Sequence, residues 1–113
     1  MLLLNENDKE YRFGDSGPKY LMRGPNIDFG IVRLKPGESF PNHLHEVIEE
    51  DFFILEGEIE FEINGEKYAT LKKGDFINVS PKNSHFLTNT GDKAAKAVFV
   101  KAPYEPKDKV NVE

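Results

Sequence analysis

The chain has 113 residues, of which 38% are hydrophobic and 31% charged, with a net charge of −5 and no cysteine. This length predicts one domain that buries about two-thirds of the surface exposed by its unfolded chain. The absence of cysteine excludes disulfides, thiolate nucleophiles and cysteine-ligated metal centres. The acidic charge, with lysines interspersed among glutamates, argues against a nucleic acid or an anionic membrane as partner.

The chain is expected to form a single domain (1–113) with three parts. Residues 1–26 are rich in glycine and proline and predict an N-terminal arm with one short strand. Residues 27–101 predict the core of strands, and residues 102–113 a polar tail or a strand added to a partner. The apolar start, residues 1–4, is far too short for a signal peptide or a membrane span, so we expect a cytoplasmic protein.

Short strands separated by turn residues are predicted from Ile27 onward. They cover residues 27–34, 39–45, 50–56, 58–63, 67–71, 76–79, 84–89 and 94–101. Pro41 places the second of them at a sheet edge or a bend. So many short strands in one small domain, without helical periodicity, predict an all-β sandwich or barrel.

The clearest strand is followed by the clearest turn. Ile59, Phe61 and Ile63 alternate with glutamates, which is the pattern of a strand with one buried and one wet face. Asn64-Gly65 comes next and predicts a tight hairpin, because a type I′ turn needs positive φ at both central residues.

All three histidines of the chain fall in two short segments. His43 and His45 are two positions apart, so on a strand they point to the same face. Glu50 can join them from the next strand, and His85 from a strand brought alongside. Imidazoles and a carboxylate together suit Fe, Mn, Ni, Co, Cu or Zn and not Mg or Ca. Taken alone, the two neighbouring histidines favour an exposed polar strand face, and only the combination with Glu50, His85 and the glycine spacing favours a metal.

The spacing around these residues resembles the two conserved motifs of the cupin superfamily. The first motif is matched at Gly37, His43, His45, Glu50 and Gly57. After an interval of 16 residues, the second is matched at Gly74, Asp75, Pro81, His85 and Asn89. Ser80 departs from the usual proline, and Lys82 stands where glycine is usual. Lys82 must therefore adopt a positive φ, or the loop before His85 differs locally.

The resemblance implies an all-β fold, a small antiparallel jelly-roll (cupin) β-barrel. It implies that His43, His45, Glu50 and His85 bind one divalent transition metal. Glu49 is a rival ligand, but the alternation of Glu50 with Phe52 favours Glu50 as the inward residue. The resemblance also implies a homodimer, with the arms at both ends of the chain as candidate exchange strands.

Several side chains are candidates for the surroundings of the metal. Five phenylalanines fit either a small apolar pocket or an ordinary core: Phe29, Phe40, Phe52, Phe76 and Phe86. Arg33, if it points inward, is suited to a carboxylate or phosphate of a ligand, and if it points outward it lies on the wet face. Asn89 is expected to hydrogen-bond backbone near the site.

Three functions remain open at this stage, because a fold does not choose a reaction. The first is a metal-dependent enzyme of the dioxygenase, isomerase or lyase type that acts on a small organic molecule. The second is a non-catalytic small-molecule-binding or sensor protein, and the third a purely structural metal. There is no fourth histidine, and the tyrosines lie outside the motifs, so chemistry carried by the metal itself is favoured.

Overall fold

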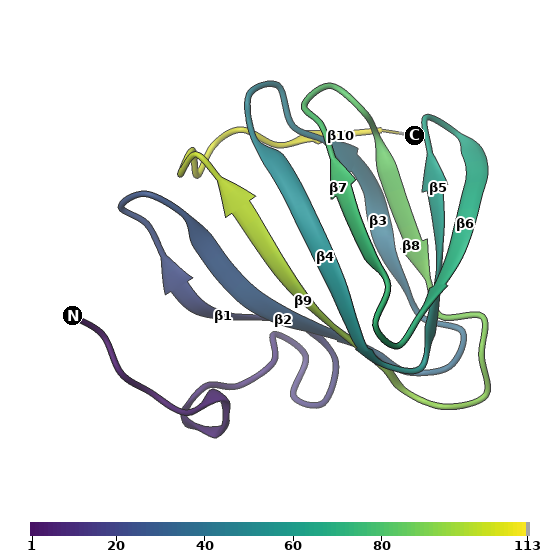
Figure 1. Cartoon of the computed structure of the whole chain (residues 1–113), viewed down its shortest axis with the longest axis horizontal. Helices are drawn as coiled ribbons and strands as arrows, with labels where there is room; N and C mark the ends of the chain where they lie inside the picture. The colour runs from purple at the N-terminus through teal and green to yellow at the C-terminus, as the bar shows by residue number, and fades with distance from the viewer. Residues whose placement is uncertain (113) are drawn as a thin grey trace.

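The computed structural model describes residues 1–112, which form two antiparallel sheets of five strands each (Figure 1). The first sheet has the order β1 (Gly17–Arg23), β2 (Asp28–Leu34), β9 (Ala95–Ala102), β4 (Glu49–Glu56) and β7 (Phe76–Val79). The second has the order β10 (Val110–Asn111), β3 (Ser39–Leu44), β8 (His85–Thr88), β5 (Glu58–Ile63) and β6 (Glu66–Lys72). The predicted all-β fold is confirmed.

One short helix precedes the strands, the 3-10 turn η1 (Glu6–Asp8). Asn5 caps it, since its side chain accepts a hydrogen bond from the Asn7 amide while the Asp8 carboxylate accepts one from the Asn5 amide. Within residues 1–112, no helix has the length and apolar character needed to cross a membrane.

The predicted hairpin is present between β5 and β6. Asn64 and Gly65 have φ values of 53° and 82°, the two positive angles that a type I′ turn requires. Lys82 also has a positive φ, 70°, so it adopts the conformation that glycine would supply at this position. The loop before His85 therefore keeps the expected turn in spite of the substitution.

The core lies between the facing sheets, and burial follows the period of two most clearly along β4, β8 and β9. The side chains that are completely or almost completely buried include Ile54, Ile59, Phe61, Leu87, Ala95 and Ala97. Gly30 on β2 allows a close approach, because a Cβ there would lie 2.4 Å from Cζ of Phe99 and 2.6 Å from the Lys19 carbonyl oxygen. The Phe99 ring thus occupies the space that a side chain at position 30 would need.

The C-terminal segment differs from its prediction as a free tail or a strand on a partner. Val110 and Asn111 pair with Leu44 and His43 of the same chain, which makes β10 the edge strand next to β3. The tail folds back because β3 would otherwise leave its ladder groups unpaired at the sheet edge. The C-terminal segment, although polar in composition, therefore packs beside the strand that carries His43.

Candidate metal centre

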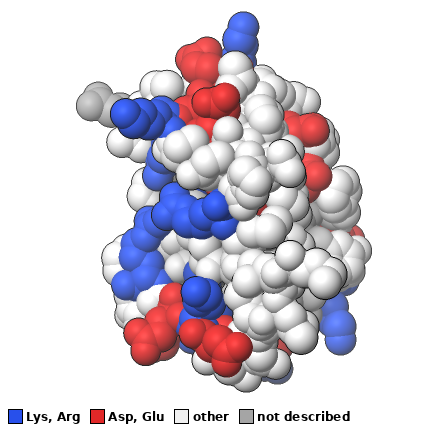
Figure 2. All heavy atoms as spheres, turned by 90° about the vertical axis from the view of Figure 1, so that its left-hand side faces the viewer, with Lys and Arg blue, Asp and Glu red and all other residues white. Residues whose placement is uncertain are grey.

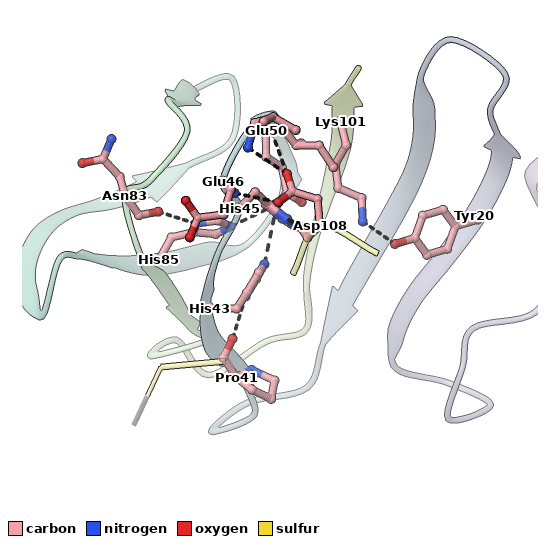
Figure 3. A network of polar contacts seen from close by, with 12 residues as sticks. Tyr20, Pro41, His43, His45, Glu46, Glu50, Asn83, His85, Lys101 and Asp108 are labelled. Carbon is pink, nitrogen blue, oxygen red and sulfur yellow. Dashed lines mark hydrogen bonds and ion pairs between the residues drawn. The ribbon is translucent and has the colours of Figure 1, made fainter. Parts of the chain in front are cut away.

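The four residues that the sequence singles out converge between the two sheets. His43 lies on β3, His45 directly follows that strand, Glu50 lies on β4 and His85 begins β8. All four are buried, and one potential ligand atom from each lies within 4.8 Å of the others. Figure 3 shows their side chains pointing toward one another. The structure therefore brings together the complete set expected around one ion.

A β-bulge in β3 sets the direction of the histidines. The register with β8 slips by one residue between Phe40 and His43, in the segment that contains Pro41. This is the bend that proline predicts, because proline has no N–H to contribute to the ladder. After the bulge, His43 pairs directly with His85, and their ring centroids are 4.2 Å apart. His45, two positions further on, faces the same side.

Backbone carbonyls fix the same tautomer in all three imidazoles. In each ring, Nδ1 lies within hydrogen-bonding distance of a carbonyl oxygen, which can only accept, so Nδ1 carries the proton. The carbonyls belong to Pro41 for His43 (2.8 Å), to Asn83 for His85 (3.2 Å) and to Asp108 for His45. In the neutral ring each Nε2 then directs its lone pair into the cluster.

Glu50 faces these lone pairs with its carboxylate. Oε1 lies 3.0 Å from Nε2 of His85, 3.2 Å from that of His45 and 3.7 Å from that of His43. Burial alone would raise the pKa of the Glu50 carboxyl, but the three imidazoles hold this pKa well below its usual range. Glu50 is therefore ionised although its side chain is buried.

The cluster calls for a cation at its centre. When the three rings are neutral with Nδ1 protonated, three imidazole Nε2 atoms and one carboxylate oxygen present lone pairs to one centre. Burial lowers the pKa of His43 against the raising effect of Glu50, which keeps this ring in the neutral form that binds metals. An N3O donor set of this kind fits a first-row transition-metal ion.

The rival ligand Glu49 points away from the cluster. Its side chain is exposed, and its Oε2 accepts a hydrogen bond from Nδ2 of Asn78 at 3.0 Å on the outer face of the sheet. Glu50 lies in the inward row of β4 with Phe52 and Ile54, as the alternation predicts.

Asp108 supports the metal centre from the C-terminal segment, and the sequence analysis missed it. Its carboxylate accepts hydrogen bonds from the amides of Glu46, Val47 and Ile48 at 2.8, 2.9 and 2.9 Å, and its carbonyl accepts one from His45. Burial would raise the pKa of Asp108, but the three amides lower it. One residue thus holds both the β3–β4 loop and the His45 ring. No local sequence signal marks it, because its partners lie some 60 positions away.

The loop before His85 is held by a second set of contacts. The Lys82 amide donates to the His45 carbonyl at 2.6 Å, which links the two histidine segments directly. Asn64 donates its amide hydrogen to the Asn83 side chain at 2.8 Å and accepts from the Ser84 amide at 3.0 Å. The hairpin turn and the histidine loop therefore brace each other.

A cavity of about 140 Å³ opens onto the cluster. His43, His45 and Glu50 contribute to its lining. Of the five candidate phenylalanines, Phe40 and Phe52 line it, while the others lie elsewhere. Phe99, which the sequence analysis did not single out, also lines it, together with Val32, Ile48 and Leu87. The cavity thus combines apolar and charged lining residues and has the metal cluster at one side.

Two other candidates lie outside the cavity. Arg33 points outward, where its Nη1 donates to the Asp15 carbonyl at 2.6 Å, so it does not face a ligand. Asn89 donates to the carbonyls of Leu34 and Lys93 at 2.9 and 2.8 Å, which is the backbone role expected for it, at the end of β8 opposite His85.

Lys101 and Tyr20 do line the cavity and were missed. A signal for Lys101 was available, because it continues the inward row Ala95, Ala97 and Phe99 on β9. Tyr20 lies outside the histidine motifs, and its contact with the cavity depends on the pairing of β1 with β2.

The comparisons with known proteins agree with this architecture. A family model described as a cupin domain matches residues 30–101, a range that contains the four residues of the cluster. The chain is 31% identical over 78 residues to the polyketide synthase CurC of Streptomyces cyaneus, an alignment that covers 69% of this chain and 50% of that protein. It is 30% identical over 88 residues to quercetin 2,3-dioxygenase of Bacillus subtilis, covering 74% of this chain and 26% of that protein.

The alignments thus cover half or less of the length of these two curated relatives. Among solved structures, the fold matches an uncharacterized conserved protein with a double-stranded β-helix domain from Klebsiella pneumoniae. The TM-score is 0.85 with 20% identity, and the match covers 100% of this chain and 98% of that one. At this identity the likeness concerns the fold, which is the double-stranded β-helix.

Proposed function

The chain belongs to the cupin family, and from this membership and the geometry of the cluster we propose that it is a metal-dependent enzyme acting on a small organic molecule. His43, His45, Glu50 and His85 would hold one divalent transition metal, of the group Fe, Mn, Ni, Co, Cu or Zn. The cavity beside the cluster would hold the substrate.

The observation that carries the proposal is the convergence of four acceptor atoms beside an open cavity. Four protein ligands would leave one or two open positions on a five- or six-coordinate ion, and the cavity beside the cluster gives a small molecule access to them. When bound, such an ion supplies Lewis acidity or redox chemistry to a molecule in its open positions. The chain's own residues orient the imidazoles through their Nδ1 hydrogen bonds and keep Glu50 ionised.

The names of the curated relatives support an enzyme. One is called a polyketide synthase and another a dioxygenase. For this chain we propose a reaction of the dioxygenase, isomerase or lyase type, three classes in which a metal-bound small molecule is the reactant. A turnover panel of sugars, keto acids and catechols on metal-loaded protein distinguishes them.

Metal content tests the site, with two adjacent glutamates as a matched pair. We expect about one equivalent of transition metal in the wild type, purified without a histidine tag and measured by elemental analysis. Glu49→Gln should retain it, because that side chain lies on the outer face. Glu50→Gln and His45→Ala should each lose it or bind it at least about tenfold more weakly. A wild type that takes up no metal after reloading refutes the proposal.

The second candidate is a protein that binds a small molecule without converting it. It is favoured by the fact that all three histidines belong to the cluster, which leaves the cavity no further imidazole as general base. A ligand retained stoichiometrically by the metal-loaded protein, without turnover on the panel, would establish this function in place of the first.

A further inference from the structure

Lys101 is an inward-facing amine beside the metal centre. It follows Ala97 and Phe99 in the inward row of β9, and its Cα is paired with that of Glu50 on β4. Paired strands lie about 4.8 Å apart, so the lysine starts directly beside a residue of the cluster. Nevertheless its Nζ turns to the hydroxyl of Tyr20, at 2.6 Å, and forms no ion pair within residues 1–112 (Figure 3).

Tyr20 is the hydrogen-bond partner of Lys101 at the cavity, and its ring is held in place by packing. Its ring packs edge to face against Phe99, with centroids 5.2 Å apart. The Arg23 guanidinium lies 4.2 Å from the centre of the Tyr20 ring. The phenol is therefore held by packing on its sides, while its hydroxyl meets the Lys101 amine at the cavity.

Further cations surround the same cavity although the chain as a whole carries a net charge of −5. Its lining includes Arg12, Arg23, Lys101 and Lys109, and none of them forms an ion pair among the described residues. Burial lowers the pKa of Lys109, and the charges of Arg12 and Lys101 lower it further, so these three cations lie within electrostatic range of one another. Figure 2 shows Lys and Arg side chains gathered in a band on the face of the molecule that carries β1.

Among the described residues, the carboxylates of the lining form no ion pair with these cations. Glu50 faces the three imidazoles, Asp28 accepts from the Gly24 amide at 3.2 Å, and Asp108 accepts from three backbone amides. Glu105 is exposed to solvent. The amine of Lys101 and the guanidinium of Arg23 are thus available to a bound anion.

From these contacts we propose, building on the proposed function, that the substrate is a small carboxylic acid whose carboxylate is bound by Lys101 and the Tyr20 hydroxyl. The cavity of about 140 Å³ admits a compact molecule, and the apolar members of its lining, such as Val32, Leu87 and Phe99, contact the carbon skeleton. A second oxygen of the same molecule reaches the metal centre. A phosphate is less suited to this site, because the site offers one amine and one hydroxyl but no group of backbone amides that could surround a phosphate.

The test is calorimetric binding to metal-loaded protein. The probes are pyruvate, succinate and benzoate, with benzamide as the neutral match for benzoate and inorganic phosphate as the competing anion. The variants are Lys101→Met, Tyr20→Phe and the control Lys72→Met, whose side chain is exposed on β6 and does not line this cavity. Metal content is measured in every sample before the titration.

We expect at least one acid to bind the wild type and Lys72→Met equally. Lys101→Met should weaken binding about tenfold or more and Tyr20→Phe several-fold, because each removes a hydrogen bond to a charged group. Benzamide should not distinguish Lys101→Met from the wild type. Equal affinities of Lys101→Met and wild type for every acid, no binding of any acid, or a preference for phosphate would overturn the inference while leaving the metal site intact. Failure to take up metal would instead refute the proposed function, on which the inference rests.

Discussion

Glu50 and Lys101 are directly opposite each other on β4 and β9, yet they do not form an ion pair. Glu50 turns to the three imidazoles, and Lys101 turns to Tyr20. Opposite charges in such a cross-strand position would ordinarily attract each other. Their separation leaves a cavity with a carboxylate at the metal centre and an amine beside it, so that each is free to meet a different part of one bound molecule.

Loading with metal should stabilise the protein. An ion present at about 100 times its dissociation constant stabilises the folded state by about 2.7 kcal/mol. In a domain of this size that corresponds to a rise in Tm of about 10 °C. Differential scanning calorimetry with and without a chelator measures it. In Glu50→Gln the chelator should have a much smaller effect, and an equal shift in both proteins would mean that the chelator acts elsewhere.

Asp108→Asn should weaken metal binding although Asp108 is not a member of the cluster. The substitution places an amide group among three donor amides, which disrupts the β3–β4 loop and with it the hydrogen bond to His45. We expect a loss of metal affinity of about 10- to 100-fold and a destabilisation of about 1–3 kcal/mol. The same change at the exposed Asp92 is the control and should leave both quantities unchanged. Competition with a chromogenic chelator gives the affinity.

The contact of Glu6 with Lys96 and Lys19 should make stability depend on pH. The Glu6 carboxylate lies 2.8 Å from Nζ of Lys96 and 3.4 Å from that of Lys19, and its hydrogen bond to Lys96 lowers its pKa. Because the pKa of Glu6 is lower in the folded state than in the unfolded state, the Glu6 charge stabilises the protein at pH values above its unfolded pKa, about 4.3. This stabilisation is lost as the pH falls through the folded-state pKa. The same hydrogen bond raises the pKa of Lys96, so that contribution is lost only as pH rises through the folded value of the amine.

Glu6→Gln should therefore destabilise the protein by up to about 1 kcal/mol near pH 7, the range of a partly exposed ion pair. The difference from wild type should shrink below about pH 4. Urea unfolding at pH 7 and at pH 3.5 measures it. Glu10→Gln, in the same arm and exposed, should differ from wild type at neither pH. A difference of equal size at both pH values would show that the Glu6 charge is not responsible.

Gly30→Ala should be much more harmful than Gly37→Ala. At position 30 a methyl group would overlap the Phe99 ring and the Lys19 carbonyl, and the latter belongs to the backbone and cannot swing away. We expect a loss of about 2–3 kcal/mol from overpacking. Gly37 has a φ of 83° but open space around it, so alanine there should cost only about 1–2 kcal/mol of backbone strain. Equal losses from chemical denaturation would contradict the packing argument.

The sequence by itself determined the fold class, most strand positions and the candidate ligands. Alternation in the strand that ends at Ile63 and the turn at Asn64-Gly65 are local signals, because the side-chain period and the sign of φ depend on neighbouring residues alone. The histidine and glycine spacing likewise carried the resemblance to cupins, which the family match confirms.

Only the tertiary structure decided which side chains surround the cluster. Asp108 meets the β3–β4 loop across some 60 residues, and Tyr20 meets Lys101 across 81. Arg33 turned outward while Lys101 turned inward, although each lies on a predicted strand. Such contacts follow from the order and register of the strands, and these are set by packing of the whole core and not by any local pattern. The metal ligands were readable because the spacing of two motifs marks them, whereas the residues that orient them and the pair proposed to bind the substrate come together only when the sheets close.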